Sequence, residues 1–208
     1  MRRSFFLALI LAAPAALCQP PRQTQNVVIL MTDGLRWQEV FSGADPALMD
    51  RKAGGAADPA ALHKQFWRES PEDRRAALLP FFWSVVAREG QVFGDRARRS
   101  QARVTNGLNF SYPGYSETFC GVADPRIDSN DRRYNPNPNV LEFLHRRPGF
   151  ENRVAAFGAW DLFPWILNAP RSGLLVNAGY EPLRVPENNH RMELLNTLKA
   201  ETEYWDSE

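Results

Sequence analysis

Two short stretches of this 208-residue chain carry residue types suited to chemistry on an ester. Asp33 directly follows an apolar run, and Ser111 stands two residues before Pro113 in the segment 109–121. A serine hydroxyl has too high a pKa to attack phosphorus at neutral pH unless a metal ion or a base activates it. Because the carboxylate of Asp33 can hold a metal, the two residues together predict metal-assisted attack by a serine.

The apolar run before Asp33 is expected to position it. Residues 26–32 read NVVILMT, a near-continuous β-branched run typical of a strand buried on both faces of a parallel sheet. Ligands of open parallel sheets bind beyond the carboxyl ends of the strands, where Asp33 would lie. The alternative is that Asp33 only caps the following turn.

A short helix is expected to begin just after Ser111 and to end at Gly121. Its start would direct free backbone N–H groups and the positive end of the helix dipole at an anion. The sequence therefore favours an anionic phosphate or sulfate ester at Ser111.

The rest of the chain indicates an α/β fold, because predicted strands alternate with helices. Ser70 and Pro71 are typical of a helix start, and that helix is expected to run to about residue 89. Further helices are predicted over 139–145 and 187–205, with strands over 153–157 and 174–176. The Pro- and Asn-rich stretch 124–139 reads as a long ordered loop, and such loops are often functional. The aromatic cluster between residues 160 and 165 is expected to pack in the core.

The two motifs, NVVILMTDG and the segment 109–121, resemble the nucleotide pyrophosphatase and phosphodiesterase branch of the alkaline phosphatase superfamily. In that branch a first strand ends in a metal-binding Asp-Gly, and a Thr or Ser in a T/S-x-P-x-x pattern is the nucleophile. The resemblance implies that Asp33 is a metal ligand and that Ser111 is both the nucleophile and a metal ligand. It also implies that Asn130 donates a hydrogen bond to a phosphoryl oxygen, although Asn130 reads equally well as a turn residue.

The resemblance carries expectations about fold and activity. The fold would be alkaline-phosphatase-like, a mainly parallel sheet flanked by helices. The activity would be metal-dependent hydrolysis of a phosphodiester or phosphomonoester through a covalent seryl-phosphate, with two divalent metal ions, zinc, as cofactors. A small-molecule phosphate or sulfate ester would be the ligand. Gly114 stands where many relatives carry Asn.

Most metal ligands of that superfamily have no counterpart in the sequence. The family uses a later Asp-x-x-x-His element, an Asp-His-Gly and a distant final His, but the three histidines, His63, His145 and His190, stand in none of these. We therefore expect residues 19–208 to be the N-terminal part of a hydrolase domain truncated at its C-terminus, with an incomplete metal site. The alternative is a non-catalytic secreted fragment or pseudoenzyme. A sulfatase ranks lower, since no Arg follows Pro113 in the sulfatase position.

The first 18 residues predict a cleaved signal peptide and hence a periplasmic or secreted protein. Arg2 and Arg3 precede an apolar run that ends before Gln19. A lipid anchor through Cys18 is a minor alternative. If Cys18 leaves with the signal, Cys120 has no internal disulfide partner, and we expect it to be a small buried residue. The formal net charge of +1 gives no reason to expect a nucleic-acid or membrane-surface partner.

Overall fold

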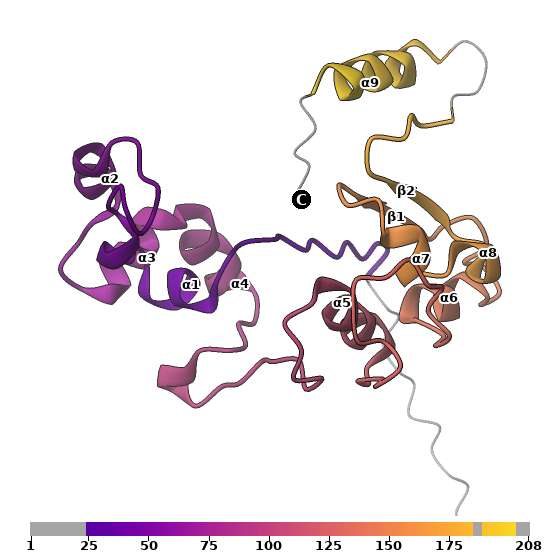
Figure 1. Cartoon of the computed structure of the whole chain (residues 1–208), viewed down its shortest axis with the longest axis horizontal. Helices are drawn as coiled ribbons and strands as arrows, with labels where there is room; N and C mark the ends of the chain where they lie inside the picture. Colours follow the sequence, from indigo (N-terminus) through magenta and orange to yellow (C-terminus); the bar gives the residue numbers. More distant parts are fainter. Residues whose placement is uncertain (1–23, 185–188, 203–208) are drawn as a thin grey trace, which may run out of the picture. The chain divides into compact units, whose positions relative to one another are not determined.

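The computed structural model describes residues 24–184 and 189–202, so the predicted signal peptide and Cys18 lie outside the described residues. The chain divides into two compact units, Met1–Gln91 and Val92–Glu208, whose elements are labelled in Figure 1. The described residues are a mixture of helices and one small sheet, which agrees with the α/β class at this coarse level. None of the described helices is long and apolar enough to cross a membrane.

The described part of the first unit is helical. Its elements are α1 (Trp37–Ser42), the 3-10 turn η1 (Pro46–Leu48), α2 (Pro59–Phe66), α3 (Pro71–Leu78), the π-helical η2 (Phe82–Val86) and α4 (Ala87–Glu89). The predicted start at Ser70 is confirmed, because its Oγ accepts from the Asp73 N–H at 3.0 Å. Helical structure reaches Glu89 as predicted, with a break at Leu79. The break has a local cause, since Pro80 disfavours the helical conformation of the residue before it.

The prediction of a buried strand over residues 26–32 is wrong. The segment forms no strand, and it exposes Val27, Val28 and Leu30 by more than four-fifths of their surface. A β-branched run fits a pleated surface, but only a ladder of hydrogen bonds to a neighbour makes it a strand. Among the described residues this segment has no such neighbour, so Asp33 does not stand at the end of a sheet strand.

The second unit contains the sheet. Its elements are η3 (Arg96–Arg98), α5 (Ser111–Cys120), α6 (Val140–His145), β1 (Ala155–Gly158), α7 (Phe163–Ile166), α8 (Ala169–Ser172), β2 (Leu175–Ala178) and α9 (His190–Glu201). The two strands pair in parallel, with Ala155 opposite Leu175 and Gly158 opposite Ala178. The predictions of both strands and of the helices at α5, α6 and α9 are therefore confirmed, although parts of the predicted last helix lie outside the described residues.

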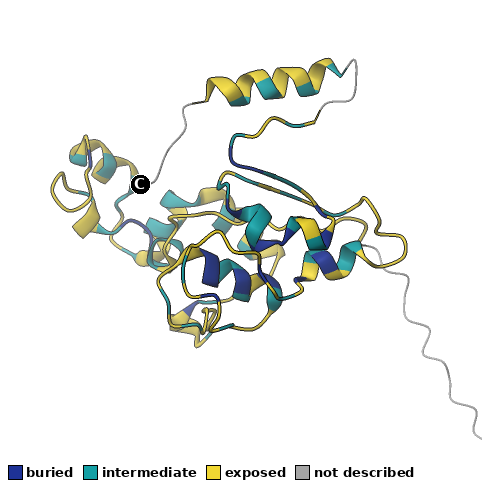
Figure 2. Cartoon of the chain, turned by 45° about the vertical axis from the view of Figure 1, so that its right-hand side comes forward, coloured by how far each residue is buried: buried dark blue, intermediate teal, exposed yellow. Residues whose placement is uncertain are grey.

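The core of this unit lies between α5, α7 and one face of the sheet. It is formed by Tyr112, Phe119, Ile127, Leu162, Ile166, Leu167 and Leu174. Ala156 and Val176 pack against it from the sheet, while Phe157 and Leu175 on the other face are exposed. Figure 2 shows the buried residues concentrated around α5 and the helices beside the sheet. The core therefore anchors the helix that begins at Ser111.

Candidate active site

Ser111 is the first residue of α5 and is exposed to solvent. The helix ends as predicted at Gly121, which has φ of 78° and donates its N–H to the Glu117 carbonyl at 2.8 Å. The left-handed conformation of Gly121 is one that glycine adopts without steric cost. The helix therefore holds an accessible serine hydroxyl at its N-terminal end.

Asn130 lies at the same end of the helix, 19 residues along the chain. Its Oδ1 accepts a hydrogen bond from the Tyr112 N–H at 3.0 Å. The structure thus brings together Asn130 and the start of α5. Because Oδ1 is the acceptor, the amide group Nδ2 has two hydrogens left to donate, and Asn130 is exposed.

The start of α5 offers fewer free backbone N–H groups than a helix start normally does. The Tyr112 N–H is bonded to Asn130, Pro113 has no N–H, and the Gly114 N–H points to the Phe110 carbonyl at 3.4 Å. Within the described chain, the Ser111 N–H is the group of this turn left without a protein acceptor. An anion at Ser111 would therefore meet one backbone donor and the Asn130 amide, rather than the four N–H groups that an uncapped helix presents.

Hydrogen bonds and apolar packing attach the loop that carries Asn130 to the core. Its Asn135 is fully buried, donates from Nδ2 to the Ser116 Oγ at 3.0 Å and accepts at its carbonyl from the Asn168 amide at 2.8 Å. Ile127 of the same loop is part of the core. The prediction of a long ordered loop over 124–139 is confirmed, and the loop holds Asn130 against α5.

Tyr112 connects α5 to this loop through its side chain as well as through its backbone N–H. Its side chain is 2 % exposed, and its hydroxyl donates to the Arg133 carbonyl at 2.7 Å and lies 3.2 Å from the Trp165 carbonyl. Burial raises the pKa of Tyr112 to about 12. The sequence analysis assigned no role to Tyr112. The spacing of Tyr112, Ser116 and Phe119 along α5 nevertheless indicates one buried face of the helix.

Replacing Tyr112 with phenylalanine is expected to lower the unfolding free energy by about 1 kcal/mol at neutral pH, because the Arg133 carbonyl loses its donor. The folded-state pKa lies above the ordinary value of 10.0, so folding favours the neutral phenol. The contribution of this group is complete below pH 10 and is lost as pH rises from 10 toward 12. Urea unfolding of both proteins at pH 8 and pH 11 tests this. A stability difference that stays the same at both values would contradict the assigned environment of Tyr112.

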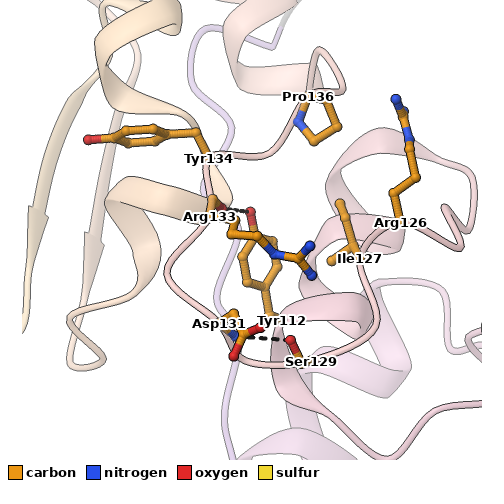
Figure 3. A pocket seen from close by; sticks show the side chains of 8 residues that line it. All are labelled: Tyr112, Arg126, Ile127, Ser129, Asp131, Arg133, Tyr134 and Pro136. Carbon is orange, nitrogen blue, oxygen red and sulfur yellow. Dashed lines mark hydrogen bonds between the residues drawn. The ribbon is translucent and has the colours of Figure 1, made fainter.

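A pocket of about 210 Å³ lies beside Tyr112. It is lined by Tyr112, Arg126, Ile127, Ser129, Asp131, Arg133, Tyr134 and Pro136. In Figure 3 the Arg133 guanidinium lies between the Tyr112 ring and Ile127. Arg133 is also paired with Asp128 at 2.9 Å. Since Ser129 and Asp131 flank Asn130, the pocket and the candidate site are built from the same loop.

Asp33 belongs to the first unit, whereas Ser111 and Asn130 belong to the second. Its carboxylate accepts a hydrogen bond from the N–H of the next residue, Gly34, at 2.7 Å. No three His, Cys, Asp or Glu side chains of the described chain come together where they could hold a metal ion. A catalytic zinc needs about three protein ligands, so the described residues do not fit the zinc pair that the resemblance implies.

Cys120 is not the nucleophile of this site. It lies at the other end of α5, is half-buried and unpaired, and burial raises the pKa of its thiol. The thiolate is the reactive form, so a raised pKa lowers its reactivity. The aromatic side chains Trp160, Phe163 and Trp165 pack against the core, as predicted, rather than lining the pocket.

Comparisons of the chain with protein-family models, with curated proteins and with solved structures gave no match. The site therefore stands on its own geometry: an exposed serine at a helix start, an asparagine side chain bonded to the same turn, and a pocket lined by the neighbours of that asparagine.

Proposed function

We propose that this chain provides the nucleophile and part of the phosphoryl-binding site of a metal-dependent phosphate ester hydrolase, related to the phosphodiesterase branch of the alkaline phosphatase superfamily. The supporting observation is the hydrogen bond from the Tyr112 N–H to the Asn130 side chain at 3.0 Å. This hydrogen bond supports the proposal because it joins Asn130 to the residue that follows the serine of the T/S-x-P-x-x motif, although Asn130 and Ser111 are 19 positions apart in the sequence. The protein would be periplasmic or secreted, and the ester a small molecule.

Ser111 would attack the phosphorus of the ester and form a seryl-phosphate while the alcohol leaves. The Asn130 amide and the Ser111 N–H would donate hydrogen bonds to a nonbridging oxygen, where negative charge increases in the transition state. Water would then release the phosphate from Ser111. Asp33 and Ser111 would be among the ligands of the two zinc ions that the resemblance implies, and such ions, when bound, would supply activation of the hydroxyl. The remaining ligands are not among the described residues, so the proposal applies to a form of the protein that has them.

The test is hydrolysis of p-nitrophenyl phosphate and bis-p-nitrophenyl phosphate, with and without added zinc, by a purified, folded form of the protein that carries the remaining metal ligands. Zinc-stimulated turnover that depends on Ser111 is the expected result. A folded protein without turnover would overturn catalysis by this chain and favour the alternative, a non-catalytic protein that retains the phosphate-binding half of a site. Binding of inorganic phosphate, measured by calorimetry, distinguishes the alternative from a wrong site assignment.

Asn130 has a structural and a proposed catalytic role that two substitutions separate. Asn130→Asp keeps an oxygen acceptor for the Tyr112 N–H but has no amide hydrogens to donate, and it adds a negative charge beside the ester. We expect it to lower turnover by about 10²–10³-fold, as loss of a transition-state donor does, at nearly unchanged stability. Asn130→Ala removes both functions and should also cost about 1 kcal/mol of stability, as loss of a helix cap does.

Turnover and urea unfolding, measured on the same preparations, separate the structural from the catalytic role of Asn130. If Asn130→Asp retained full turnover, Asn130 would be a capping residue only, and the proposed phosphoryl contact would be wrong.

A further inference from the structure

The segment between α4 and α5 contains an arginine cluster that the proposed function does not use. Residues 90–110 join α4 to α5, and η3 is the only helical turn among them. The sequence there reads Arg96-Ala97-Arg98-Arg99 and then reaches Arg103, and these four arginines are all exposed. Since the boundary between the units falls at Gln91 and Val92, the cluster follows it directly.

The first part of the cluster is held in a closed turn. Asp95, which is buried, accepts at its carbonyl from the N–H groups of Arg98 and Ser100, both at 3.0 Å. Its side chain accepts from the Ala97 N–H at 3.1 Å, and the Ser100 hydroxyl accepts from the Gly94 N–H at 3.0 Å. Arg99 completes the turn in the left-handed conformation. A protease that binds its substrate as an extended strand would have to break this turn to reach the bond after Arg99.

The next four residues lack the hydrogen bonds that close this turn. Gln101, Ala102, Arg103 and Val104 are exposed and form no hydrogen bond with any other described residue, either through the backbone or through side chains. The chain is held again only at Thr105, whose N–H donates to the Glu117 carboxylate at 2.6 Å. The bond between Arg103 and Val104 therefore lies in an accessible stretch between two anchored points.

Two other basic loop residues are more restrained. Arg51 lies in a turn that Asp50 closes by accepting from the Lys52 and Ala53 N–H groups at 2.6 Å. Arg153 donates its N–H to the Phe150 carbonyl at 3.0 Å just before β1. Limited proteolysis occurs where exposed backbone needs little local unfolding to enter a protease.

We propose that the Arg103–Val104 peptide bond is a limited-proteolysis site for an arginine-specific serine protease of the trypsin type. Such enzymes select Arg or Lys by a carboxylate at the base of the specificity pocket. Hydrolysis of this bond consumes one water and leaves a carboxylate on Arg103 and a free amine on Val104. It divides the chain into a piece with Asp33 and a piece with Ser111 and Asn130. If the proposed function holds, cleavage would break the covalent link between Asp33, the predicted metal ligand, and Ser111, the proposed nucleophile. The cleavage itself does not depend on that function.

The experiment is brief digestion of the folded chain with a small amount of trypsin, followed by intact-mass measurement and sequencing of the new N-terminus. We expect the first new N-terminus to be Val104. Arg103→Gln should reduce the rate of this first cut at least tenfold, whereas the matched Arg99→Gln should leave it unchanged. Far-UV circular dichroism of the variants confirms that the fold is retained.

A first cut after another Arg or Lys within residues 24–202 would overturn the proposal. An unchanged rate in Arg103→Gln would also overturn it, as would equal slowing in Arg99→Gln. Because the readout is a peptide mass rather than ester hydrolysis, a chain without phosphatase activity tests the proposal equally well.

Discussion

Replacing Ser111 with alanine is expected to reduce zinc-stimulated hydrolysis of both nitrophenyl esters to the uncatalysed background. The substitution removes the only atom proposed to attack phosphorus. It leaves the helix start intact, because the Ser111 side chain is exposed and accepts no capping hydrogen bond. The measurement is the initial rate of nitrophenolate release, together with urea unfolding to show that stability is unchanged.

Two further variants act as controls for this prediction. Ser111→Thr keeps a hydroxyl nucleophile and is expected to retain measurable turnover, since the motif accepts Thr or Ser. Ser116→Ala removes another serine of the same helix, but one that is buried and bonded to Asn135 at 3.0 Å. It should lower stability by about 1–3 kcal/mol, the cost of an unsatisfied buried amide, with turnover retained by the folded fraction. Activity in Ser111→Ala equal to that of the unmodified chain would show that Ser111 is not the nucleophile.

Replacing Arg171 with methionine is expected to destabilise the second unit by about 3–5 kcal/mol, the usual cost of removing one partner of a buried ion pair. Arg171 pairs with Glu142, whose side chain is 1 % exposed, at 2.9 Å. It also donates to the carbonyls of Asn135, Pro136 and Asn137 at 2.8–2.9 Å. The variant therefore leaves a buried carboxylate with one partner fewer and three carbonyls without this donor. Urea unfolding monitored by far-UV circular dichroism measures the effect.

Arg146 provides the matched control, because it pairs with the same carboxylate at 2.7 Å but is 57 % exposed. Arg146→Met is expected to cost no more than about 1 kcal/mol, as exposed ion pairs do. The double variant Glu142→Leu/Arg171→Met should recover part of the stability lost in Arg171→Met, since it no longer buries a carboxylate that has lost one of its two partners. Equal effects of Arg171→Met and Arg146→Met would contradict the assigned role of Arg171.

Much of the second unit could be predicted from the sequence because its signals are local. The start of α6 follows from Asn139, whose side chain accepts from the Glu142 N–H at 2.9 Å. The end of α5 follows from Gly121, and the two short strands follow from their apolar residues. The π-helical turn η2 was not predicted, because such turns leave no local signature beyond a nearby proline.

The failures concern interactions that are not local. The run 26–32 has every local property of a buried strand, yet whether it becomes one depends on a partner that no local pattern specifies. The proximity of Asn130 to the start of α5 was expected only from the resemblance, because the rest of α5 and part of an irregular loop lie between Ser111 and Asn130 in the sequence. The closed turn at Asp95 and the open stretch at Arg103 also depend on hydrogen bonds that composition does not reveal.

The start of α5 bears on the charge state of the ester that Ser111 can accept. Asn130 occupies the Tyr112 N–H and Pro113 has none, so few donors remain to neutralise a phosphoryl group. A phosphomonoester near neutral pH carries about two negative charges, whereas a phosphodiester carries one. In the absence of added positive charge, so sparse a set of donors tolerates a monoanion better than a dianion. Without the positive charge of metal ions, the donors at the start of α5 would thus suit a diester better, because its second ester group reduces the charge that the protein must stabilise.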